Sequence, residues 1–148
     1  MRIAAEDYEA LKAFFAWASE HLLKIPVSLP PDQHPVSVLA GFEARSMAAA
    51  RNGLALAIGD IVEDCESLPA ERVKAIDAAL GAEGVVTLSE VRARFGRAIR
   101  AIMKRGKVRN ESEYYALRNA VDAMAKPERA DAGRLLAAFE TRSAERRA

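Results

Sequence analysis

Apolar side chains recur along this chain every three or four residues, and no other feature of the sequence constrains the fold as strongly. The first apolar stripe comprises Leu11, Phe14, Phe15, Ala18 and Leu22. An α-helix completes a turn in about 3.6 residues, so this spacing places the side chains on one face. Alanine, which has the highest helix propensity, occurs 31 times, and β-branched residues rarely alternate with polar ones. The sequence therefore predicts an all-α protein.

Prolines mark the end of the first helix and the linker that follows it. Pro26 ends the helix that begins near Glu6, because proline cannot donate the backbone hydrogen bond that a helix requires. Four prolines lie within residues 25–35, which we expect to form an extended Pro-rich linker. A long helical stretch follows over about residues 35–66, and Asn52-Gly53 in its middle favours a bend.

Capping residues indicate where the later helices begin and end. Pro69 stands in the first turn of one helix, and Gly81 is placed to end it in the left-handed conformation. Thr87 and Glu90 have the spacing of a capping box. We therefore expect one continuous helix from this point to Gly106.

The last third of the chain adds two more helices. Asn110 caps the first of them, and the second begins near Pro127. Short connections favour neighbours that pack roughly antiparallel. We expect residues 1–148 to form a single-domain bundle of five or six helices, with the Pro-rich linker inside it and a frayed tail over residues 143–148.

The sequence also bears on the cellular compartment. Cys65 is the single cysteine, so no internal disulfide can form, which suits a reducing compartment. The N-terminus lacks the apolar core of a signal peptide, and no run approaches the roughly 18 apolar residues of a membrane span. We expect a cytoplasmic protein with no membrane partner. Arginine outnumbers lysine by sixteen to six, which indicates a GC-rich bacterial genome.

Charge is distributed unevenly along the chain. Residues 1–80 hold seven basic and twelve acidic side chains, a net charge of −5, whereas residues 81–148 hold fifteen and nine, a net charge of +6. Separated charges of this kind favour steering and register at an interface with a partner.

The strongest candidate site is a run of cations over residues 92–109 that no acidic residue interrupts. Counted at about 100° per residue, the cations of the helix lie opposite Val91, Phe95, Ile99 and Ile102. One side can therefore pack while the other presents positive charge. We call this surface the basic strip, and its expected partner-binding residues are Arg94, Arg97, Arg100, Lys104, Arg105, Lys107 and Arg109.

Three interpretations of the basic strip stay open: a solvated face, an acidic protein surface as partner, or nucleic acid. The isoelectric point of about 7.9 is below the roughly 9 of dedicated nucleic-acid domains, and no aromatic residues interleave for base stacking. We therefore predict a non-enzymatic protein-interaction module, such as a regulator, adaptor or neutralising partner. Its partner is another protein with an acidic surface or a second copy in a homodimer, and nucleic-acid binding is the alternative.

An acidic patch is the second candidate. Asp60, Glu63 and Asp64 share one helix face by their spacing. Carboxylates so placed can bind Mg²⁺, so a Mg²⁺-dependent helical hydrolase is a further alternative, although we identify no second acidic pair to face them. We find no nucleophile motif, phosphate-binding loop or recognised metal-ligand spacing in the sequence. We accordingly expect no catalytic residue, no metal and no cofactor.

Overall fold

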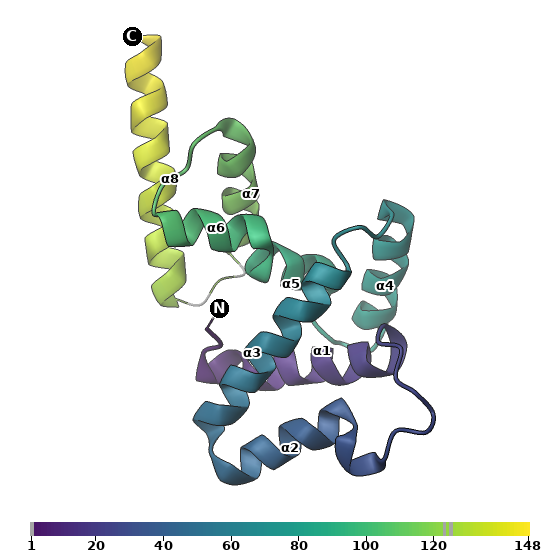
Figure 1. Cartoon of the computed structure of the whole chain (residues 1–148). Coiled ribbons are helices and arrows are strands. Elements are labelled where there is room, and N and C mark those ends of the chain that lie inside the picture. Colours follow the sequence, from purple (N-terminus) through teal and green to yellow (C-terminus); the bar gives the residue numbers. More distant parts are fainter. Residues whose placement is uncertain (1, 123, 125) are drawn as a thin grey trace. The chain divides into compact units, whose positions relative to one another are not determined.

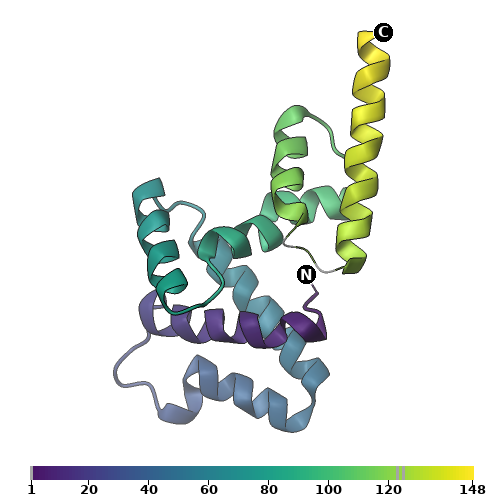
Figure 2. The same ribbon diagram turned by 180° about the vertical axis from the view of Figure 1, so that it is seen from behind.

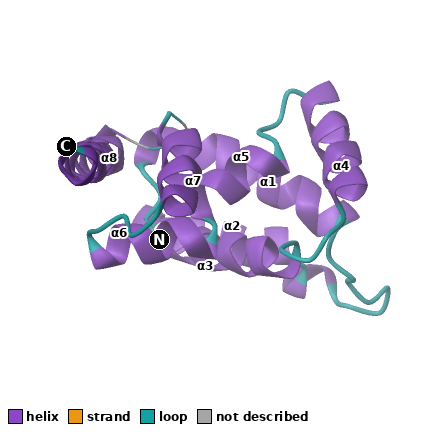
Figure 3. Ribbon diagram, turned by 90° about the horizontal axis from the view of Figure 1, so that it is seen from above, coloured by secondary structure: helices purple, strands orange, loops and turns teal. Residues whose placement is uncertain are grey.

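The computed structural model describes residues 2–122, 124 and 126–148. Figure 3 shows helices and connecting loops, and no strand occurs in these residues, which confirms the all-α class. The helices form two compact units, unit 1 (Met1–Leu88) and unit 2 (Ser89–Ala148). The single domain expected from the sequence stays a prediction.

Three helices of unit 1 pack on one another. The elements of this unit are η1 (Ala5–Asp7), α1 (Tyr8–His21), η2 (Pro31–Gln33), α2 (Pro35–Arg45), α3 (Met47–Asp64) and α4 (Ala70–Ala82). Helix α1 packs against α2 and α3, and α2 packs against α3 (Figures 1 and 2). The first apolar stripe is buried as expected over Leu11, Phe14, Phe15 and Ala18. Leu22 follows the end of α1 and is half-buried. Between α1 and α2 the chain forms only the single 3₁₀ turn η2, in keeping with the prolines of this segment.

Polar contacts also join α1 to α2. The Tyr8 hydroxyl donates a hydrogen bond to Oε1 of Glu43 at 2.7 Å, and Nζ of Lys12 lies 2.7 Å from the same oxygen. Burial, followed by the contact with Glu43, raises the pKa of the Tyr8 hydroxyl. The hydrogen bonds from Lys12 and Tyr8 hold the pKa of the Glu43 carboxyl below its usual range. Lys12 and Glu43 therefore form an ion pair between α1 and α2.

The prediction of one long helix over about residues 35–66 is wrong. The helix is interrupted at Ser46, and the second helix, α3, runs through Asn52-Gly53 without a break. Ser46 is extended (φ −169°, ψ 134°), and its hydroxyl oxygen accepts a hydrogen bond from the Ala49 amide at 3.1 Å. Gly53 lies inside α3, where a Cβ would stand 3.2 Å from Cδ2 of Phe42. This glycine therefore serves the close approach of α2 to α3.

The end of α4 also differs from the expectation. The helix continues past Gly81 to Ala82, and Gly84 takes the left-handed conformation with a φ of 70°. The amide of Val85 then donates to the carbonyl of Leu80 at 3.0 Å, as in a Schellman motif. The left-handed glycine at the end of α4 is therefore Gly84, three residues later than expected.

Unit 2 has its own core. Its helices are α5 (Leu88–Phe95), which begins at the last residue of unit 1, α6 (Arg97–Arg105), α7 (Glu111–Val121) and α8 (Lys126–Arg147). Helix α7 packs against both α6 and α8 (Figures 1 and 2). The buried cluster comprises Ile99, Ile102, Val108, Tyr114, Leu117, Ala120, Met124 and Ala132. Helix α8 continues to Arg147, and the expected fraying of residues 143–148 stays a prediction.

The continuous helix expected from Thr87 to Gly106 is also wrong, because it is divided at Gly96. This residue has a φ of −62° and a ψ of 153°, so it is extended and begins α6. Its amide still donates to the carbonyl of Arg92 at 2.8 Å. A Cβ at position 96 would stand 2.5 Å from that carbonyl oxygen, so the break needs a residue without a side chain. Because both long helices are divided, the described residues contain more helices than the five or six expected.

Candidate functional site

The charge asymmetry of the sequence follows the division into units. Unit 1 holds seven basic and thirteen acidic side chains, a net charge of −6. Unit 2 holds fifteen basic and eight acidic side chains, a net charge of +7. All residues of the basic strip lie in unit 2, and all residues of the acidic patch lie in unit 1.

The break at Gly96 distributes the basic strip over two helices and a turn. Arg94 lies on α5, four members lie on α6, and Lys107 and Arg109 lie in the turn between α6 and α7. The exposed members are Arg97, Lys104, Lys107 and Arg109, and the half-buried members are Arg94, Arg100 and Arg105. The strip is therefore not the single straight helix face that the spacing predicts.

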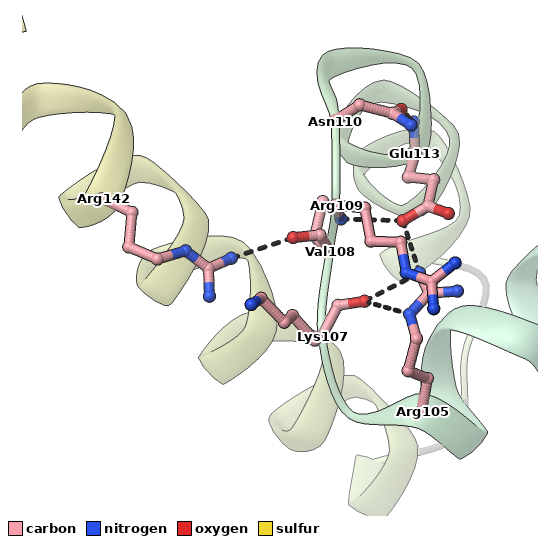
Figure 4. A network of polar contacts seen from close by, with 7 residues as sticks. All are labelled: Arg105, Lys107, Val108, Arg109, Asn110, Glu113 and Arg142. Carbon is pink, nitrogen blue, oxygen red and sulfur yellow. Dashed lines mark hydrogen bonds and ion pairs between the residues drawn. The ribbon is translucent and has the colours of Figure 1, made fainter. Parts of the chain in front are cut away.

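Local hydrogen bonds determine the shape of the turn between α6 and α7. Gly106 ends α6, as the sequence predicts, and takes the left-handed conformation with a φ of 71°. Its amide donates to the carbonyl of Ile102 at 2.9 Å. The guanidinium of Arg105 folds back over the turn, where Nε and Nη2 donate to the carbonyl of Lys107 at 3.0 and 2.8 Å (Figure 4).

Glu113 is the centre of this polar network. Its Oε2 accepts from the amide of Arg109 at 2.8 Å and from Nη2 of Arg105 at 2.5 Å (Figure 4). Its own amide donates to Oδ1 of Asn110 at 2.9 Å, which confirms Asn110 as the cap of α7. Burial acts to raise the pKa of the Glu113 carboxyl, but the hydrogen bonds from Arg109 and Arg105 outweigh it and hold this pKa below its usual range. The carboxylate is thus ionised at neutral pH and joins both sides of the turn.

A contact from α8 completes the network. Nη2 of Arg142 donates to the carbonyl of Val108 at 2.9 Å, across 34 residues of chain (Figure 4). The side chain of Val108 itself is buried in the core of unit 2. Sequence spacing carries no signal for this contact, because it depends on how α8 packs. Arg105, Glu113 and Arg142 thus all hold the backbone of the turn, while the side chains of Lys107 and Arg109 stay exposed.

The acidic patch is exposed on α3, as its spacing predicts. Asp60 and Asp64 line an open groove of unit 1, whereas Glu63 does not. In the described residues, no group of three or more His, Cys, Asp and Glu side chains is placed to hold a metal ion.

Comparisons with known proteins name no relative for this chain. No protein-family model, no curated protein and no solved structure matches it. Within the described part of the chain, no helix has both the length and the apolar character needed to cross a membrane. Function must therefore be inferred from the residues of the chain itself.

Proposed function

We propose that this chain is a non-enzymatic protein-interaction module that binds an acidic surface of another protein. The contact residues are Lys104, Lys107 and Arg109, which are exposed in and next to the turn between α6 and α7. The observation that carries the proposal is the internal network of Arg105 and Glu113, which holds this turn in one shape while its other cations face solvent.

A fixed turn improves binding because less conformational freedom is lost when the partner docks. A single exposed ion pair contributes only about 0–1 kcal/mol, so affinity requires several cations that act together. The net charge of +7 on unit 2 adds long-range attraction, which raises the rate of association with an acidic surface.

Nucleic acid is the second candidate partner. In its favour, Tyr115 on α7 is 58% exposed, and aromatic side chains can stack on bases. Against it, the Glu113 carboxylate of α7 lies against the turn and repels phosphate. We therefore favour the acidic protein.

The test is a charge reversal of Lys104, Lys107 and Arg109 to glutamate in the full chain. A matched variant carries Lys126→Glu, Arg134→Glu and Arg146→Glu, which changes the net charge equally at exposed positions of α8. Each protein is used as bait for affinity purification from the native host, and circular dichroism checks that it is folded. We expect acidic proteins bound by the wild type to be lost with the first variant and retained with the second.

Equal loss with both variants would show that net charge alone governs binding and would contradict the proposed site. Binding of short DNA or RNA duplexes that weakens steeply with salt would replace it with the nucleic-acid alternative. Sedimentation of the purified protein at several concentrations separates a homodimer from binding to a different protein. Any dimer that forms through these cations should dissociate in the first variant alone.

A further inference from the structure

Unit 1 contains an open apolar groove of about 410 Å³ between α1, α2 and α3. Its apolar walls include Phe15 from α1, Val38 and Phe42 from α2, and Ala57 and Ile61 from α3. Val38 is 44% exposed, so the groove opens to solvent. A groove of this size lies within the range of roughly 300–1,000 Å³ that is typical of small-molecule sites.

Two carboxylates stand at the edge of the groove. Asp60 and Asp64 are one helical turn apart on α3, and both line it and are exposed. The carboxylate of neither residue forms a hydrogen bond or ion pair with the described residues. None of the described residues that line the groove is Lys, Arg or His. The groove therefore has apolar walls and two carboxylates, and no cationic side chain among its described lining residues neutralises them.

This combination selects the chemistry of the ligand. An apolar body removes the exposed surface of the walls from water. An ammonium group at one end can donate charge-assisted hydrogen bonds to carboxylates, and an anion would be repelled. We propose that the groove binds a small organic cation with an apolar body, of the alkylammonium or arylalkylammonium class. Its ammonium lies at Asp60 and Asp64 and its apolar body lies against Phe42 and Ile61. The proposal concerns unit 1 and is independent of the function proposed for unit 2.

The experiment uses 2-phenylethylammonium chloride as the probe and 2-phenylethanol as its neutral analogue. Both are titrated into the full chain, and amide chemical shifts and calorimetry report the position and the dissociation constant. We expect the ammonium to bind at least about tenfold more tightly than the alcohol, because a hydrogen bond to a charged group is stronger than a neutral one. The perturbed amides should belong to α2 and α3.

Two variants and a matched control assign the contacts. Asp60→Asn with Asp64→Asn should weaken binding of the ammonium by about tenfold and leave binding of the alcohol unchanged. Glu66→Gln with Glu83→Gln removes the same charge at exposed residues of unit 1 outside the groove and should change neither. Ala57→Phe fills the groove and should abolish binding of both probes, with circular dichroism as the check of folding.

Three results would overturn the proposal. One is equal affinity for the ammonium and the alcohol, and another is unchanged ammonium binding in the double Asn variant. The third is binding of a cationic amphipathic peptide in the groove without any binding of the small ammonium, which would make it a docking site for protein.

Discussion

Replacement of Gly96 by alanine tests the break between α5 and α6 directly. The amide of Gly96 donates to the carbonyl of Arg92 at 2.8 Å, and a Cβ at position 96 would stand 2.5 Å from that same oxygen. The oxygen belongs to the backbone of α5, so it cannot move aside as the end of a flexible side chain can. A side chain at position 96 therefore either breaks the hydrogen bond from its amide to the Arg92 carbonyl or displaces the backbone of α5.

We expect Gly96→Ala to lower the free energy of unfolding by about 2 kcal/mol. Close carbon–oxygen contacts in proteins are about 3.3 Å, well beyond the 2.5 Å imposed here. Overpacking that displaces the backbone costs about 1–3 kcal/mol, and the preference of the N-cap position for glycine over alanine acts in the same direction. In a continuous helix the same substitution would instead stabilise by about 1 kcal/mol, so the two structures predict opposite signs.

Urea denaturation followed by far-ultraviolet circular dichroism measures this difference. Gly133→Ala is the matched control, because Gly133 lies inside α8 and a Cβ there would have no neighbour within 4 Å. We expect the control to stabilise the protein by about 1 kcal/mol. If Gly96→Ala stabilises as much as Gly133→Ala, the residues from 88 to 105 form one helix and our account of the break is wrong.

Three further predictions concern stability. Leu117→Ala should lower the free energy of unfolding in urea by about 3 kcal/mol, because Leu117 is fully buried and its truncation leaves a cavity; a loss below about 1 kcal/mol would contradict the packing of unit 2. Asn110→Ala should cost about 1 kcal/mol in the same assay, since the cap of α7 is lost, whereas Asn110→Ser should retain most of it. Lys12 holds the pKa of the Glu43 carboxyl below its usual value of 4.5, so this contact stabilises the fold above that pH and the contribution is lost as the pH falls through the lowered pKa. Glu43→Gln should therefore weaken the acid dependence of unfolding below about pH 4.5, and an unchanged dependence would refute the role of the ion pair.

Much of the helical content could be predicted because it depends on residues close in sequence. The spacing of Phe14 and Phe15 identified the buried face of α1, and that of Ile99 and Ile102 identified the buried face of α6. The end of α6 at Gly106 and the cap of α7 at Asn110 were also predicted correctly. Each of these features is decided within about one helical turn, where propensity, period and capping act together.

The candidate sites were predicted less completely. The exposure of Asp60, Glu63 and Asp64 follows from helical period alone, and the structure agrees with it. The groove beside Asp60 depends on how α1 and α2 pack against α3, and the apolar period of each helix does not specify that packing. Arg105 has the spacing of a surface cation, but its contact with Glu113 requires the folded turn.

The sequence by itself determined that the chain is helical, which faces of its helices are apolar, and that its two halves carry opposite charge. Tertiary structure decided where the long apolar stretches break, at Ser46 and Gly96 and not at Gly53, and which distant groups meet, as Arg142 and Val108 do. The physical reason is that period and capping act over a few residues, whereas a break persists only where packing on other helices stabilises it.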